Sequence, residues 1–167
     1  MTQSYLDVES PLGTLRLIAE DGALCALRLP NQLGSKPELE GKRDPILKAA
    51  AAQLREYFAG RRQSFDLPLS LGGSAFQKAA WKALQRIPFG QTRSYGEQAR
   101  AIARPKASRA VGGANHRNPI AIIVPCHRVI GSDGSLTGYG GGEPAKRWLL
   151  EHEARVLAGG KRSQPRA

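Results

Sequence analysis

The chain has 167 residues, of which 41% are hydrophobic, and carries a formal net charge of +11 at pH 7. This length suits one domain or two small ones with a real core. Its apolar stretches are too short to span a bilayer, and no signal-peptide pattern opens the chain. Two cysteines, Cys25 and Cys126, cannot build a disulfide framework or a four-thiolate zinc site, so we expect a cytoplasmic protein without metal or membrane segment.

Three short apolar-rich runs open the chain, at residues 5–8, 14–19 and 23–29. Asp21-Gly22 separates the second run from the third, and Asp-Gly between such runs predicts a hairpin. We therefore predict a small antiparallel sheet, with Cys25 as a core residue of its third strand. Residues 30–43 show no periodicity and are predicted to form a loop.

A helix is predicted to follow this loop. Asp44 is a favourable N-cap, and Pro45 suits the first helical position. Apolar residues continue at helical spacing to Phe58, and Gly60 ends the helix. Residues 61–73, which contain a proline and two glycines, are the expected connection to a second domain.

Positive charge is confined to the second half of the chain. Residues 1–72 carry nine Lys/Arg and nine Asp/Glu, whereas residues 73–167 carry sixteen Lys/Arg and five Asp/Glu. A solvated basic face is the simplest explanation of such a pattern. The segregation nevertheless favours a polyanion, and in particular nucleic acid, as a partner of this half.

This basic half begins with helices. Ser74 and Ser94 each form a capping-box pattern with the Gln or Glu three residues later, which predicts a helix after each serine. The second of these helices should end near Ala103, and a third should span residues 106–114. Two short helices joined by so short a break suggest a helix-turn-helix.

The third of these helices contains Gly112 and Gly113 in its middle. Each glycine costs a helix interior about 1 kcal/mol relative to alanine. Such residues are expected where a helix lies very close to another surface, such as a DNA groove. Contact with a neighbouring helix is a nearly equal alternative.

Residues 120–129 read I-A-I-I-V-P-C-H-R-V. A short continuous apolar run predicts a buried strand or extended segment, and Pro125 ends any strand ladder. Cys126 beside His127 at the end of this run suggests a nucleophile with a base in reach. A buried structural cysteine with a satisfied core histidine is the alternative. Residues 131–142, with six glycines and Tyr139, form a loop before a final helix that is predicted to begin at Pro144.

P-C-H-R-V at 125–129, preceded by N-P-I at 118–120, resembles the signature of O6-alkylguanine-DNA alkyltransferases, also called methylated-DNA–protein-cysteine methyltransferases. Four further segments match in order and spacing: S-Y at 94–95, R-A-V-G-G at 109–113, Y-G-G-G at 139–142 and W-L-L-x-H-E at 148–153. The resemblance covers most of residues 74–157. The N-terminal part matches only in kind, as a small sheet and a helix.

The resemblance and the predicted elements together imply an α+β fold. It would consist of a small antiparallel-sheet-plus-helix scaffold domain at residues 1–72, and a mostly helical domain with the helix-turn-helix at residues 73–158. Residues 159–167 are predicted to form a disordered basic tail.

The resemblance also implies DNA repair by direct reversal. An alkyl group would pass once and irreversibly from O6-alkylguanine, and from O4-alkylthymine, to Cys126, and this chemistry requires no cofactor. Glu153 would orient His127, which takes the thiol proton through a water, while Tyr95 donates to a guanine ring nitrogen. The alternatives are that His152 is the partner instead of His127 and that Glu153 is an exposed helix acid.

By the same resemblance, the substrate pocket would contain Asn118, Val129, Tyr139 and Gly140. The helix at 106–114 would lie in the minor groove of a duplex, and the target nucleotide would be rotated out of the stack. Arg109 would take the place of this nucleotide. The other expected DNA-binding residues are Ser94, Ala110, Gly112, Gly113 and Arg117. We expect a monomer, and the sequence leaves cooperative binding along DNA open.

Three other functions fit parts of the pattern. Alkyltransferase-like proteins bind the lesion but lack the reactive cysteine, and the presence of Cys126 argues against that function. A helix-turn-helix regulator would need an effector module, and none is evident. A Cys-His hydrolase would regenerate its thiol with water and act on acyl bonds.

Overall fold

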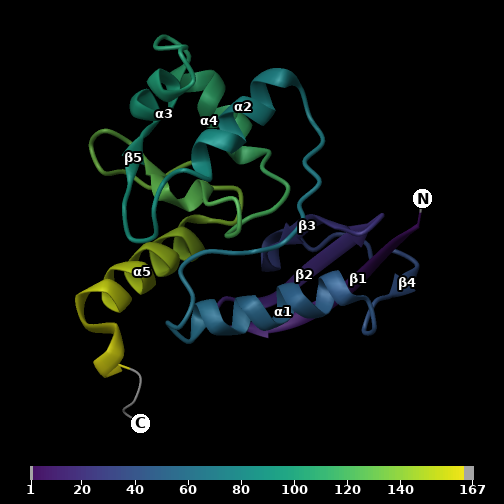
Figure 1. Cartoon of the computed structure of the whole chain (residues 1–167). Coiled ribbons are helices and arrows are strands. Elements are labelled where there is room, and N and C mark those ends of the chain that lie inside the picture. Colours follow the sequence, from purple (N-terminus) through teal and green to yellow (C-terminus); the bar gives the residue numbers. More distant parts are fainter. Residues whose placement is uncertain (1, 164–167) are drawn as a thin grey trace.

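The computed structural model describes residues 2–163, and side chains only as far as residue 159. A four-stranded sheet with one long helix forms one part of the molecule, and most of the helices form the other (Figure 1). This arrangement confirms the predicted α+β fold. Among the described residues, no helix is both long and apolar enough to cross a membrane.

The sheet has the strand order β3-β2-β1-β4. The first three strands are antiparallel: β1 (Gln3–Ser10), β2 (Gly13–Glu20) and β3 (Ala23–Arg28). Asp21 and Gly22 both have positive φ, 53° and 77°, as a two-residue hairpin with the favoured twist requires. The segment predicted as a loop contains a short 3₁₀ helix, η1 (Pro30–Gln32), and strand β4 (Leu39–Glu40), which pairs parallel to β1.

Cys25 lies in β3 as predicted, but it is partly exposed and is not a core residue. Successive side chains of a strand point to opposite faces. Leu24 and Ala26 are therefore buried, whereas Cys25 points the other way and lines an open cavity of about 480 Å³ with His116 and Arg117. Because the residues around Cys25 are nearly all apolar, the sequence does not show which positions of β3 are buried and which are exposed.

Helix α1 (Pro45–Phe58) lies along the sheet (Figure 1). The Asp44 carboxylate caps it by accepting from the backbone N–H groups of Ile46 and Leu47. Five side chains of one helix face are buried: Leu47, Ala50, Ala51, Leu54 and Tyr57. The predicted helix and its cap are confirmed.

The C-terminal half contains α2 (Ala75–Leu84), α3 (Tyr95–Ala101), α4 (Ser108–His116) and α5 (Glu143–Ser163). Both predicted capping boxes are present, at Ser74 and Ser94. The indole N–H of Trp81 donates to the Ala114 carbonyl at 2.8 Å, and Gln98 and Asn115 exchange amide hydrogen bonds of 2.7 and 2.9 Å. These buried bonds tie α2, α3 and α4 into one unit, because leaving any of these polar groups unpaired would be costly.

The free edge of β3 joins the two halves of the chain. Leu24 forms a parallel bridge with Leu69 of the connecting segment, and Leu27 forms one with Ile120. A single hydrophobic core extends across the junction and includes residues of both halves. The segment before Cys126 is therefore fixed directly to the N-terminal sheet.

Residues 120–124 are buried as predicted, but they do not form a strand. Only Ile120 makes a bridge, and Ile122 has a positive φ of 72°. The Asn118 side chain accepts from the Ile120 N–H and donates to the Val124 carbonyl, so the segment closes on itself as a turn. The 3₁₀ helix η2 (Cys126–Arg128) and strand β6 (Val129–Ile130) follow, and β6 pairs parallel to β5 (Arg93–Ser94).

Helix α5 extends further than predicted. The helix runs to Ser163 with non-helical backbone at Gly159, within the segment that the sequence predicts as a disordered tail. Residues 164–167 of the predicted tail lie outside the described residues.

Candidate active site

Cys126 begins η2 and is 7% exposed. The Asn118 side-chain N–H donates to its sulfur at 3.2 Å. Burial raises the pKa of the thiol, because it disfavours the charged form, while the Asn118 hydrogen bond and the charge of Lys146 act in the opposite direction. The sulfur is thus fixed in one position with a donor aimed at it.

His127 is fully buried, and its Nε2 lies 2.8 Å from a carboxylate oxygen of Glu153. An ionised carboxylate can only accept, so Nε2 must carry the proton and Nδ1 must present a lone pair. Nδ1 is buried and has no hydrogen-bond partner among the described residues. Burial also holds the pKa of His127 below its usual value. This tautomer of neutral histidine is the one a general base requires.

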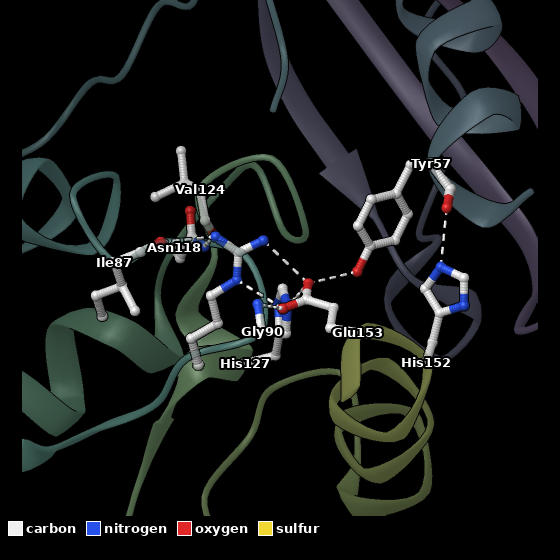
Figure 2. Close-up of polar contacts among 9 residues, drawn as sticks. Tyr57, Ile87, Gly90, Asn118, Val124, His127, His152 and Glu153 are labelled. Atoms are coloured by element: carbon white, nitrogen blue, oxygen red, sulfur yellow. Dashed lines mark hydrogen bonds and ion pairs between the residues drawn. The ribbon is translucent and has the colours of Figure 1, made fainter. Parts of the chain in front are cut away.

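Glu153 is buried and receives hydrogen bonds from both halves of the chain (Figure 2). His127, the Gly90 N–H and two nitrogens of Arg128 donate to it at 2.8–3.0 Å, and the Tyr57 hydroxyl donates at 2.6 Å. Burial opposes ionisation, but the hydrogen bonds from His127 and Arg128, together with the charge of Arg128, outweigh it and hold the pKa of Glu153 well below its usual value. The arginine balances the carboxylate charge, so His127 can remain neutral.

His152 makes different contacts. Its Nε2 lies 2.8 Å from the Tyr57 carbonyl oxygen, and its ring stacks on Trp148 with centroids 4.8 Å apart. Figure 2 shows it on the far side of Tyr57 from His127. The structure therefore pairs His127 with Glu153, and Glu153 is not an exposed helix acid.

Tyr95, Tyr139 and Lys146 lie together beside Val129, the residue that follows η2. Pairing of β5 with β6 places Arg93 opposite Val129 and Ser94 opposite Ile130, and Tyr95 follows directly as the first residue of α3. Lys146 Nζ donates to the Val129 carbonyl at 2.6 Å and lies 5.9 and 5.7 Å from the ring centroids of Tyr95 and Tyr139. The Tyr139 hydroxyl is buried and has no hydrogen-bond partner in the described part of the chain.

Gly140 lies where the glycine-rich loop meets the N-terminal domain. Its carbonyl accepts from the Asn31 side chain at 3.1 Å. A Cβ at this position would lie 2.9 Å from the Gln32 amide nitrogen and 3.2 Å from the His116 carbonyl. A side chain at this position would therefore crowd the His116 backbone and displace the Gln32 amide.

The residues expected to bind DNA lie on or beside the exposed face of α4. Arg109, Ala110 and Gly113 are exposed within the helix, and Arg117 is exposed at its C-cap. A side chain at Gly113 would meet no atom within 4 Å, so contact with a neighbouring helix does not explain this glycine. A Cβ at Gly112 would lie at an ordinary contact distance of 3.6 Å from the Tyr95 ring, and the Ser94 hydroxyl caps α3.

Sequence reasoning missed three contributors to this site. Tyr57 occupies the apolar face of α1 and reads as an ordinary core residue. The sequence suggests that Lys146 is a surface cation of a helix. No sequence pattern indicates that the backbone N–H of Gly90 donates to the Glu153 carboxylate. The only signal was indirect, because Tyr57 and Lys146 both lie on helix faces that also carry buried apolar residues.

The short helices α3 and α4 thus stand in the same half of the chain as a buried cysteine whose neighbouring histidine is bound to a buried carboxylate, an arrangement that suits a nucleophile with a base in reach. Comparison with known proteins makes this assignment specific. Residues 75–155 match the family model "6-O-methylguanine DNA methyltransferase, DNA binding domain", and residues 3–71 match its "ribonuclease-like domain". The chain belongs to the 6-O-methylguanine DNA methyltransferase family.

Comparisons with individual relatives support the same family membership. The chain is 51% identical over 152 residues to the methylated-DNA–protein-cysteine methyltransferase of Mycolicibacterium paratuberculosis, covering 90% of this chain and 92% of that protein. Its fold matches the crystal structure of Mycobacterium tuberculosis O6-methylguanine methyltransferase with a TM-score of 0.83 at 48% identity, over 93% and 94% of the two chains. The Mycobacterium tuberculosis OGT structure in complex with DNA matches with a TM-score of 0.82 at 50% identity, over 92% and 94%.

Proposed function

We propose that this chain repairs DNA in the cytoplasm by moving an alkyl group from O6-alkylguanine, and from O4-alkylthymine, to Cys126. The observation that carries the proposal is the arrangement around Cys126. Its sulfur accepts a hydrogen bond from Asn118, and the next residue, His127, is a neutral base fixed by Glu153. The names of the relatives, which describe transfer to a protein cysteine, support the same reaction.

The reaction balances without a cofactor. The Cys126 S–H proton passes through a water to Nδ1 of His127, and the thiolate attacks the alkyl carbon in line. A carbon–sulfur bond forms as the carbon–O6 bond breaks, and the bonding pair stays on the guanine. Tyr95 supplies a proton to a guanine ring nitrogen, and the proton taken up by His127 is returned through solvent to restore the Tyr95 hydroxyl. The product is a thioether, which offers no route back to a thiol, so each molecule reacts once.

The target atom lies inside a duplex, so the nucleotide must leave the stack to reach Cys126. In our proposal α4 enters the minor groove with its small residues against the duplex, and the exposed Arg109 occupies the place of the flipped nucleotide. Residues 73–158 then form the DNA-binding and acceptor domain of a monomer, and residues 1–72 form the scaffold domain. Tyr139 and Gly140 line the pocket that receives the base.

The stoichiometry of alkyl transfer tests this proposal. With a duplex that contains O6-[³H-methyl]guanine in excess, we expect labelling to stop at one methyl group per molecule, because the thioether cannot be hydrolysed. Peptide mapping should place the label on Cys126. Continued turnover would indicate a hydrolase, and binding of the duplex without transfer would indicate a lesion binder.

Arg109 provides a test of nucleotide flipping. Arg109→Ala should slow repair of the methylated duplex by roughly tenfold or more, since opening a base stack costs a few kcal/mol, while the reaction with free O6-benzylguanine should keep its rate. Arg104→Ala, which removes another exposed arginine of the same half, is the matched control for charge. Equal losses on the two substrates would contradict the role of Arg109.

A further inference from the structure

Tyr57 is a tyrosine of the N-terminal domain whose hydroxyl reaches the carboxylate beside His127. It lies in the last turn of α1, is fully buried, and donates to Oε2 of Glu153 at 2.6 Å (Figure 2). Burial and the negative charge of Glu153 raise the pKa of the Tyr57 hydroxyl, which therefore keeps its proton and acts as a donor. A distance of 2.6 Å is typical of a strong, charge-assisted hydrogen bond to a carboxylate.

The same carboxylate oxygen also accepts from His127. Nε2 of His127 lies 2.8 Å from Oε2, and Nη2 of Arg128 donates to Oε2 at 3.0 Å. Oε1 is occupied separately, by the Gly90 N–H and by Nε of Arg128. Donors that share one oxygen compete for its negative charge. The short bond from Tyr57 therefore weakens the attraction between Glu153 and the imidazole of His127.

We propose that Tyr57 is a positioning residue that sets the base strength of His127, acting through Glu153. This inference rests on the proposed role of His127 in alkyl transfer and extends the chemistry to the N-terminal domain. The full charge of Glu153 would favour the protonated imidazole, and a protonated His127 cannot accept the Cys126 proton. The Tyr57 hydroxyl takes up part of that charge and so keeps Nδ1 unprotonated at neutral pH.

A purely structural role is the competing explanation for Tyr57. Its backbone carbonyl contacts His152 of α5, and its ring packs against three phenylalanines: Phe58, Phe65 and Phe89. A substitution that preserves these contacts and changes only the hydroxyl separates the two roles.

Two such substitutions change the hydroxyl in opposite directions. Tyr57→Phe removes the donor and keeps the ring. Tyr57→3-fluorotyrosine keeps the donor and strengthens it, because fluorine makes the hydroxyl more acidic. Tyr5→Phe removes a hydroxyl from β1 of the same domain and is the matched control.

Proton NMR of the full-length chain with ¹⁵N-labelled histidine measures the bond between His127 and Glu153, through the Nε2–H resonance of His127. The same spectra, recorded against pH, give the titration of each histidine. The measurement needs neither DNA nor alkyl transfer, so its outcome is separate from that of the proposed function. His152 is the internal control for distortion of α1, because it contacts the Tyr57 carbonyl that every variant retains. The exposed His116 is the reference.

We expect the His127 Nε2–H resonance to move downfield in Tyr57→Phe, because the bond to Glu153 tightens when a competing donor is lost. It should move upfield in Tyr57→3-fluorotyrosine. The pKa of His127 should rise by about half a unit to one unit in Tyr57→Phe. The acid inflection of the alkyl-transfer rate should rise with it, while the rate above that inflection is retained. The other groups that face His127 are the same in every variant: Cys126 and Arg128 from η2, and Lys146 and Glu153 from α5.

Three results would overturn the inference: an unshifted His127, shifts of the same sign in the two variants, or a His152 shift as large as that of His127. A transfer rate that falls equally at every pH would likewise assign Tyr57 a structural role. If Tyr57→Phe does not fold, Tyr57→3-fluorotyrosine carries the test by itself, since it predicts a shift of defined sign.

Discussion

Cys126→Ala is expected to abolish alkyl transfer from a methylated duplex and to leave duplex binding intact. Transfer should end because the substitution removes the sulfur that our proposal assigns as the acceptor of the alkyl group. Binding persists because Arg109, Gly113 and the rest of the exposed face of α4 do not contact the thiol. The measurement is incorporation of label from an O6-[³H-methyl]guanine duplex, together with the dissociation constant for the same duplex.

Cys25→Ala is the matched control for this prediction. Cys25 is a second free cysteine in the same chain and is more exposed than Cys126. Burial and the negative charge of Glu20 raise the pKa of its thiol, and none of its described hydrogen bonds involves a histidine. The variant should therefore incorporate the full amount of label. Residual transfer in Cys126→Ala, or label on Cys25, would mean that the acceptor has been misassigned.

Local signals in the sequence were sufficient for most of the fold. Asp44 with Pro45, and the two capping boxes, predict helices because the capping side chain and the backbone groups it satisfies are neighbours in sequence. The Asp21-Gly22 hairpin is local in the same sense. The pairing of Cys126, His127 and Glu153 was also predicted, but from a family resemblance and not from any pattern of spacing.

The remaining features depend on partners far apart in the chain. Asn118 bends residues 120–124 into a turn that their apolar composition does not indicate. Tyr57 reaches Glu153 across 96 residues of sequence, and the burial of Lys146 depends on Tyr95 and Tyr139 closing over it. Hydrophobic patterning reports how buried a position is, but not which polar group a buried side chain will meet.

Tyr57 also gives the N-terminal domain a specific relation to the site. It donates to the same Glu153 oxygen that contacts His127, and its backbone carbonyl contacts His152 of α5. Leu27 meanwhile holds the segment that begins at Ile120. The sheet and α1 therefore hold both the segment that leads from Ile120 to Cys126 and the carboxylate of Glu153. The N-terminal domain thus does more than cover the C-terminal domain.

Glu153→Ala is expected to destabilise the protein and to slow alkyl transfer. The substitution leaves the guanidinium of Arg128 buried without its counter-charge, and breaking a buried pair in this way costs about 3–5 kcal/mol. Tyr57→Phe, which deletes one donor to the same carboxylate and keeps the ring, should cost less, about 1.5–3 kcal/mol. Urea unfolding at pH 7 measures both, and a smaller loss in Glu153→Ala than in Tyr57→Phe would contradict the central place of the carboxylate.

The role of Glu153 also predicts how the free energy of unfolding changes with pH. Because the pKa of Glu153 is depressed in the folded state, its contribution is present above the ordinary glutamate value and is lost as the pH falls below it. Burial depresses the pKa of His127 as well, so acid destabilises through this residue from about pH 6.5 downward. In Glu153→Ala the free energy of unfolding should fall less steeply toward acid pH, with a residual slope from Asp7, whose pKa is lowered by its hydrogen bond from Arg16.

Alkyl transfer by the Glu153→Ala variant should fall by roughly 10²–10⁴-fold, the usual contribution of a general base, because His127 loses the acceptor that fixes its tautomer. Unfolding free energies between pH 3 and 8, with single-turnover rates at pH 7, would show whether one carboxylate governs both properties.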